Sequence, residues 1–170
     1  GIHRLATMEK PFVTAINGPA AGAGLSLAIL GDIALTAASA HFTSAYSAVG
    51  LTPDGGASWW LPRLIGMRRA QEMIFTNRRI GAEEAAGMGL VTRVVADDRL
   101  RTEASAVAST LAKGPIRALA RCRSLLVESI NADLSTQLDR EAASIAESAG
   151  AAEGREGVAA FLAKRPPHFV

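Results

Sequence analysis

Cysteine, aromatic residues and long apolar runs are all scarce in this chain of 170 residues. Cys122 is the one cysteine, so the sequence predicts no internal disulfide and no thiol cluster for a metal ion. The longest apolar stretch, residues 20–30, is interrupted by Gly22, Gly24 and Ser26 and is too short to cross a bilayer. No basic segment followed by an apolar one opens the sequence. These absences favour a cytoplasmic protein in a reducing environment, with no membrane insertion.

Blocks of like charge are also absent. The 18 basic and 16 acidic residues are interleaved and leave a net charge of +2, so no dense basic segment predicts a nucleic-acid partner. His3, His41 and His168 are scattered, without the spacing of a metal site. We therefore expect neither nucleic acid nor metal to be bound.

An apolar content of 49% is enough for a globular core. Short apolar runs with the pattern of a strand alternate with runs that have the pattern of a helix along the first part of the chain. They predict strands at 12–16, 33–36 and 90–95 and helices at 25–30, 67–75 and 82–87. A turn is predicted at 52–56. This order of elements is typical of an α/β fold.

The composition changes after Asp97. Apolar residues then recur at helical spacing, which predicts helices at 100–111, 116–130, 134–145 and 158–162, and the segment 143–157 is rich enough in Ala and Gly to predict loose order. We expect two domains, an α/β core at 1–97 and a helical subdomain at 98–170. Several amphipathic helices cannot all bury their apolar faces against one small sheet, so the helical part is expected to self-associate.

The most informative segment is AINGPAAGAGLSLAILGD, residues 15–32. It predicts a strand that turns at Asn17-Gly18-Pro19 into a helix opened by Gly22 and Gly24. The first amides of a helix have no partner within it and can hold an oxyanion. Glycine lets a carbonyl ligand come close to the backbone. Gly24 is therefore a candidate oxyanion donor.

A second informative segment is LTPDGG, residues 51–56. Pro53 and the two glycines favour a tight turn, in which Asp54 can serve as a turn or N-cap residue or as a catalytic carboxylate. The apolar and aromatic residues expected to shield its carboxylate from water are Tyr46, Trp59, Trp60 and Leu61.

Both segments resemble the crotonase family, the enoyl-CoA hydratases and isomerases. The likeness continues through residues 50–95 and through EGVAAFLAKR, residues 156–165. It implies part of a crotonase-like ββα spiral core, lacking roughly the family's first third, followed by a helical subdomain that forms trimers, often paired into hexamers. It also implies an acyl-CoA substrate and no cofactor other than the coenzyme A that this substrate carries.

The resemblance implies catalytic roles, and the departures from it are informative. The amide of Gly24, next to Ala23, matches a donor to the thioester oxygen. Enoyl-CoA hydratases carry two glutamates where this chain has Ser26 and Tyr46. Water addition needs one group to activate water and another to manage the α-proton, so a hydratase is disfavoured. We expect Ser26 to leave room for substrate and Tyr46 to shape the acyl pocket.

Asp54 is the remaining carboxylate, and its surroundings resemble the LxPDxGG pattern of epoxyphenylacetyl-CoA isomerases. One carboxylate can carry a proton between two carbons of an enolate, so the resemblance implies a double-bond isomerase with Asp54 as acid/base. Two alternatives remain open. The run at 66–79 resembles 4-chlorobenzoyl-CoA dehalogenases, in which Asp54 would be the nucleophile. The other alternative is a truncated, non-catalytic assembly module.

Further binding residues are expected at three positions. Trp59 is a candidate for lining the acyl pocket. Phe161 and Lys164 match residues of the family's C-terminal helix that meet the nucleotide part of CoA, and a lysine suits a phosphate as a point charge. Fatty and aromatic acyl groups are both compatible with the sequence.

Overall fold

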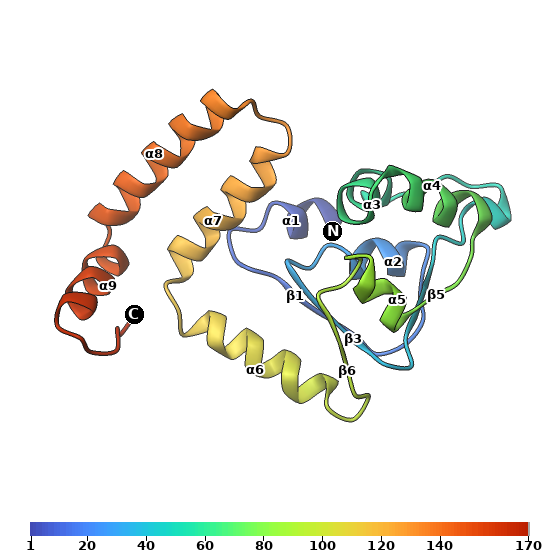
Figure 1. Cartoon of the computed structure of the whole chain (residues 1–170), viewed down its shortest axis with the longest axis horizontal. Helices are drawn as coiled ribbons and strands as arrows, with labels where there is room; N and C mark the ends of the chain where they lie inside the picture. Colours follow the sequence, from blue (N-terminus) through green and yellow to red (C-terminus); the bar gives the residue numbers. More distant parts are fainter. Residues whose placement is uncertain (170) are drawn as a thin grey trace. The chain divides into compact units, whose positions relative to one another are not determined.

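The computed structural model describes residues 1–169, which form two compact units. The first comprises Gly1–Thr7 and Phe12–Val107, and the second comprises Met8–Pro11 and the chain from Ala108 onward. In Figure 1 the blue-to-green part of the chain contains strands and short helices, whereas the orange and red part is helical.

A parallel three-stranded sheet forms the centre of the first unit. Its strands are β1 (Val13–Ile16), β3 (Ile33–Ala37) and β6 (Arg93–Val95), in the order β1-β3-β6. Val13 is opposite Ile33, and Leu35 is opposite Arg93. Strands whose faces are covered by other elements are built mainly from short runs of apolar and β-branched residues. These three segments contain such runs.

A smaller sheet and several helices complete the first unit. The sheet pairs β2 (Ala20–Ala21) with β4 (His41–Thr43) in parallel, and β4 with β5 (Ile80–Gly81) in antiparallel orientation. The helices are α1 (Ile2–Ala6), α2 (Ala23–Ala28), α3 (Ala57–Ile65), α4 (Met67–Thr76) and α5 (Ala82–Gly87), with a 3₁₀ turn η1 (Ser47–Val49).

One hydrophobic core holds this unit together. Its fully buried side chains come from both sheets and from the helices that cover them, and include Leu25, Leu35, Phe42, Leu61 and Met73. Burial of each such side chain contributes about 1.5–3 kcal/mol relative to exposure. The core lies directly beneath the α2 turn, because Leu25 follows Gly24 and is completely buried.

The helical part begins with α6 (Leu100–Ala112), which continues from the first unit into the second. The second unit contains α7 (Ile116–Ser129), α8 (Leu134–Gly150) and α9 (Ala152–Leu162). Asp133 caps α8, because its carboxylate accepts a hydrogen bond of 2.9 Å from the Thr136 amide.

Two of the expected elements are corrected by the structure. The expectation that residues 143–157 are loosely ordered is wrong, since α8 runs to Gly150 and α9 begins at Ala152. Alanine is a strong helix former, and the two glycines inside α9 are tolerated there. The strand expected at 90–95 forms only over Arg93–Val95, because the Leu90 amide instead donates to the Ala85 carbonyl at 2.8 Å and closes α5.

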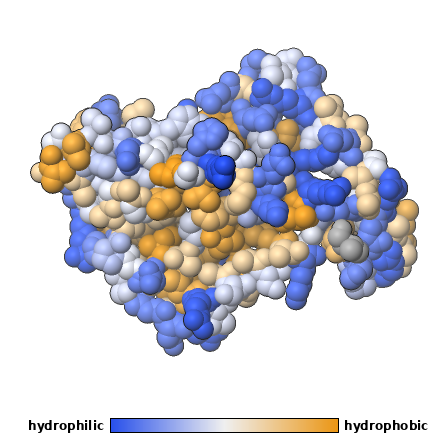
Figure 2. Space-filling model, turned by 180° about the vertical axis from the view of Figure 1, so that it is seen from behind, coloured by the Kyte–Doolittle hydropathy of each residue, from blue (hydrophilic) through white to orange (hydrophobic). Residues whose placement is uncertain are grey.

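Apolar side chains reach the surface as well as the core, and orange groups of them are visible in Figure 2. Those of the second unit that are more than half exposed are Leu126, Leu134, Leu138, Ile145, Val158, Phe161 and Leu162. Among the described residues, no helix combines the length and the apolar character needed to span a bilayer.

Candidate active site

The glycine turn before α2 has the backbone geometry that the sequence predicts. Gly22 has φ 52° and ψ −124°, a combination that residues with a Cβ avoid. The first hydrogen bond of α2 runs from the Ser26 amide to the Gly22 carbonyl at 3.1 Å. The amides of Ala23 and Gly24 lie in the first turn, ahead of any acceptor within the helix. Both residues are exposed, and a Cβ built on Gly24 would meet no atom within 4 Å.

Gly24 also lies at a groove beside β1. The groove has a volume of about 460 Å³ and is lined by residues 12–20 together with Gly24, Leu27 and Ala28. Space beside an unpaired amide is what an oxyanion site needs. The oxyanion role of Gly24 remains a prediction.

The loop that carries Asp54 packs against the same helix. The buried Ser26 hydroxyl donates to the Asp54 carbonyl at 2.9 Å. Gly55 follows with φ 61°, and a Cβ there would lie 2.7 Å from the Ser26 Cβ. The loop comes this close to α2 only because residue 55 has no side chain.

Tyr46 meets the Asp54 carboxylate directly. Its hydroxyl donates a hydrogen bond to Asp54 Oδ1. The ring lies over Gly22, since a Cβ at Gly22 would stand 3.7 Å from Tyr46 Cζ. Hydrogen bonds thus link Asp54 to Ser26 and to Tyr46, and Gly24 lies in the same helix as Ser26. These four predicted site residues belong to one neighbourhood built from α2, Tyr46 and the loop at 52–56.

The Tyr46 phenol stays protonated well into the alkaline range. Burial raises the pKa of Tyr46, and the hydrogen bond to Asp54 raises it further, while the Ser26 hydroxyl acts in the opposite direction. A neutral phenol has a proton to donate, so Tyr46 can serve Asp54 as a hydrogen-bond donor.

The expected shielding of Asp54 from water is not observed. The Asp54 residue is exposed, whereas Leu61 is fully buried and Trp60 packs against the core. Helix α3 starts at Ala57 and buries Leu61, and the Trp60 ring lies against Gly56, since a Cβ built there would be 3.4 Å from Trp60 Cδ1. Only Tyr46 among the expected shielding residues bonds to the carboxylate.

Trp59 is fixed by its neighbours in α3. Its ring lies 4.5 Å from the Trp60 ring at an interplanar angle of 82°, and the Arg63 guanidinium sits 4.0 Å above it. Arg63 also donates to the Trp59 carbonyl at 2.9 Å. These contacts hold a half-buried aromatic face in place, and its predicted part in an acyl pocket remains a prediction.

Phe161 and Lys164 belong to the second unit. Phe161, in α9, is 80% exposed, and Lys164 follows the helix in a left-handed conformation with φ 51°. Their predicted contact with CoA remains a prediction.

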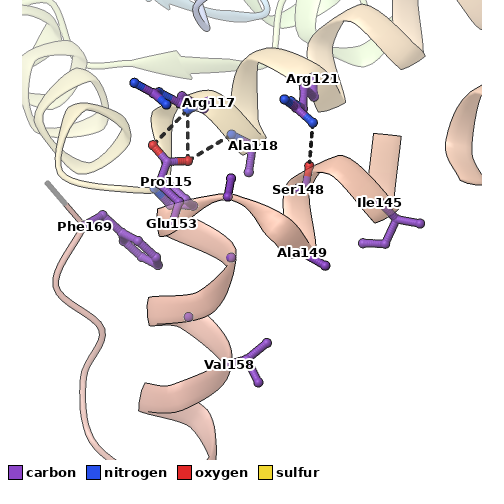
Figure 3. Close-up of a pocket in the computed structure, with 13 residues that line it drawn as sticks. Pro115, Arg117, Ala118, Arg121, Ile145, Ser148, Ala149, Glu153, Val158 and Phe169 are labelled. Carbon is purple, nitrogen blue, oxygen red and sulfur yellow. Dashed lines mark hydrogen bonds between the residues drawn. The ribbon is translucent and has the colours of Figure 1, made fainter. Parts of the chain in front are cut away.

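The second unit contains a hollow of about 310 Å³ between α7, α8 and α9 (Figure 3). At its rim Glu153 accepts hydrogen bonds from the amides of Arg117 and Ala118 at the start of α7, at 3.1–3.2 Å. Arg121 donates to the Ser148 hydroxyl at 3.4 Å. None of the predicted site residues lines it, and Glu153 has a structural role there as a cap for α7.

No group of three or more side chains suited to a metal ion is found among residues 1–169. The neighbourhood offers a backbone amide, a carboxylate and a phenol for chemistry. Sequence reasoning missed two supporting roles. Gly22 lies beneath the Tyr46 ring, and Ala45, with φ 61°, turns the chain just before Tyr46. Neither role has a signal in the sequence, because both depend on residues brought together by the fold.

Comparison with known proteins identifies the family. The model of the enoyl-CoA hydratase/isomerase family matches residues 1–170. The chain belongs to the enoyl-CoA hydratase/isomerase family. It is 45% identical over 159 residues to a probable enoyl-CoA hydratase of Rhodobacter capsulatus, covering 94% of this chain and 62% of the relative. It is 41% identical to the 1,2-epoxyphenylacetyl-CoA isomerase of Escherichia coli, covering 99% of this chain and 64% of the relative.

Solved structures of the enoyl-CoA hydratase/isomerase family share the fold. A crystal structure described as an enoyl-CoA hydratase/isomerase from Mycobacterium abscessus matches with a TM-score of 0.96 and 38% identity, covering 99% of this chain and 65% of that chain. This confirms the predicted crotonase-like α/β fold with C-terminal helices. The chain spans about two thirds of the length of these relatives or slightly less. The relatives' names include both a hydratase and an isomerase, so the names alone do not distinguish the two reactions.

Proposed function

We propose that this chain provides the acid/base part of an acyl-CoA thioester isomerase, with Asp54 moving the proton and the Gly24 amide stabilising the enolate oxygen. The observation that carries the proposal is the hydrogen bond from Tyr46 to Asp54 in a loop packed against the α2 turn. Family membership supports a CoA thioester as substrate, and the 41% identity to an epoxyphenylacetyl-CoA isomerase supports isomerisation.

The reaction needs one proton carrier. The Asp54 carboxylate takes a proton from the α or γ carbon of an enoyl thioester, and the electron pair of that C–H bond moves into the conjugated enolate. The thioester oxygen gains negative charge, which the Gly24 amide would stabilise. Asp54 then returns a proton to the other end of the system, and the double bond has moved with no net gain or loss of atoms.

Hydration of the double bond is less well supported. It needs a second acid/base group close to the first. Ser26, at the place of one family glutamate, is fully buried and donates to the Asp54 carbonyl. Tyr46, at the place of the other, is a phenol with a raised pKa. Neither side chain is a carboxylate that could activate water near neutral pH.

The remaining predicted residues would complete substrate binding. Ala23 and Trp59 would line the acyl site, Ser26 would keep it open from beneath, and Phe161 and Lys164 would meet the nucleotide part of CoA. Phe161 and Lys164 are exposed enough for this. The family resemblance supports a homotrimer or hexamer acting in the cytoplasm.

The proposal is tested by proton exchange at the α carbon. In heavy water a β,γ-enoyl-CoA should lose its α-proton signal in NMR spectra and convert to the α,β isomer. Asp54→Asn should slow both by a factor of about 100 or more, because an amide cannot accept the proton. Asp98→Asn makes the same chemical change at another exposed position and should leave both rates unchanged.

The two alternatives give different results in the same assays. With a 4-halobenzoyl-CoA in heavy-oxygen water, labelling of Asp54 after one turnover would indicate a nucleophile and a dehalogenase-like reaction. A chain that neither exchanges protons nor becomes labelled would be an assembly module, and the proposed catalytic role would be wrong.

A further inference from the structure

Tyr46 forms hydrogen bonds at both ends of the loop that leads to Asp54. The Tyr46 carbonyl accepts hydrogen bonds from the amides of Val49 at 3.1 Å and Leu51 at 3.0 Å. The Tyr46 hydroxyl donates to Asp54 Oδ1. The backbone of one residue therefore fixes the start of this loop, and its side chain fixes the carboxylate at the far end.

The direction of the Tyr46 side chain is itself set by the residues before it. Ser44 is 1% exposed and anchors the chain in the core. Ala45 then adopts φ 61°, a left-handed conformation that is strained for a residue with a Cβ. Such strain persists only where surrounding contacts enforce it. Here the left-handed conformation of Ala45 directs the Tyr46 ring across Gly22, which has no side chain to block the ring.

The two oxygens of the Asp54 carboxylate are consequently not equivalent. Oδ1 is the acceptor of the Tyr46 hydroxyl. Ser26 bonds to the Asp54 backbone carbonyl and not to the carboxylate. The hydrogen bond to Oδ1 restricts rotation of the carboxylate about its χ2 bond, and the exposure of Asp54 leaves the other oxygen open to a ligand.

We propose that Tyr46 is a positioning residue that holds Asp54 through Oδ1, so that Oδ2 alone carries the proton in the isomerisation. The inference rests on the proposed function and assigns Tyr46 a role other than shaping the acyl pocket. A carboxylate fixed in one orientation avoids the loss of rate that follows when a catalytic group is misplaced by about 1 Å.

The contact can be measured without any substrate. Tyr46 is the one tyrosine in the chain, so the ultraviolet absorbance of tyrosinate reports this residue alone. In the wild-type chain its ionisation should have a midpoint above 10.0. Asp54→Asn should lower that midpoint, because the carboxylate no longer opposes the phenolate charge. Asp98→Asn should not move it, and circular dichroism over the same pH range monitors folding.

The positioning role is then measured in the α-proton exchange assay. Tyr46→Phe keeps the ring over Gly22 and removes only the hydroxyl. It should reduce exchange at saturating enoyl-CoA by about 10- to 100-fold while KM stays within a factor of about two, since binding does not use the hydroxyl. A purely structural role would instead lower stability with kcat unchanged for the folded fraction.

The outcomes separate this inference from the proposed function. If Asp54→Asn leaves the tyrosine midpoint in place, or if Tyr46→Phe exchanges protons as fast as the wild type, Tyr46 does not position Asp54. If the wild type exchanges no protons, the proposed function is wrong and the positioning role is wrong with it. The tyrosine titration shows which failure has occurred, because it detects the contact without turnover.

Discussion

Gly55 is the residue at which the candidate site depends most directly on the absence of a side chain. Its φ of 61° and its 2.7 Å approach to the Ser26 Cβ leave no room for a methyl group, and the Ile2 Cδ1 is only 2.8 Å from the same point. The loop carrying Asp54 and the helix carrying Gly24 can therefore pack together only with glycine at this position.

Gly55→Ala should lower the free energy of unfolding by about 2–5 kcal/mol, the sum of a left-handed alanine and an overpacked contact. Gly50→Ala is the matched control, because Gly50 has φ 71° but nothing within 4 Å of the added Cβ. It should cost only about 1–2 kcal/mol. Urea unfolding of both variants measures the difference, and equal losses would show that the contact with Ser26 does not constrain the loop.

The residues of the candidate site differ in how far the sequence reveals them. Glycine and proline mark the turns around Gly24 and Asp54, since their backbone preferences are local. The bond between Tyr46 and Asp54 is not local in the same sense, because no single helix or strand contains both residues. It depends on the left-handed Ala45 and on the space above Gly22, which only the folded chain brings together.

At the scale of elements, the strength of the local pattern decides what can be predicted. The helix at Ala82–Gly87 is confirmed over its full length, and β1, β3 and α7 agree closely with their expected ranges. The short strand β4 and the helix α1 lack a long periodic run and were not predicted. Residues 143–157 were expected to be loose, but Glu153 in α9 meets the amides at the start of α7 and holds this segment in place.

One carboxylate, that of Glu156, bonds α9 to the residues that follow the helix. Arg165 donates to both oxygens of Glu156 at 2.7 and 2.9 Å, and the His168 amide donates at 2.8 Å. The Arg165 hydrogen bonds, followed by that of His168, lower the pKa of Glu156 to about 2. Its ordinary value is 4.5, so the ionised form is favoured by the fold.

Because the folded pKa is the lower one, this carboxylate stabilises the fold fully above about pH 4.5 and loses its contribution as the pH falls towards 2. In NMR spectra the Glu156 carboxyl carbon should titrate near pH 2, and Arg165→Gln should move that midpoint well towards 4.5. Arg155→Gln removes an arginine that bonds elsewhere, to the Gly150 carbonyl, and should leave it unchanged. A wild-type midpoint near 4.5 would contradict the assignment.

At the scale of the whole molecule, the two units differ in how completely they bury their apolar residues. The first has a continuous core. In α8, by contrast, no residue is buried, and Leu134, Leu138 and Ile145 are exposed by 74%, 54% and 68%. Their spacing places them along one side of the helix. The amphipathic pattern was evident in the sequence, and within the described residues this stripe stays exposed.

We therefore expect the chain to self-associate, as a trimer or hexamer if it follows the family, and sedimentation velocity should detect this. Covering a large apolar side chain contributes about 1.5–3 kcal/mol, so replacing both Leu138 and Ile145 by Lys should weaken association by a factor of about 100 or more.

Ala143→Lys is the control, because Ala143 is exposed on the other side of α8. A wild-type chain that sediments as a monomer at all accessible concentrations would show that this stripe does not join copies of the chain. If Ala143→Lys weakens association as much as the double variant does, the added charge is the cause. If only the double variant weakens association, the interface lies on the stripe itself.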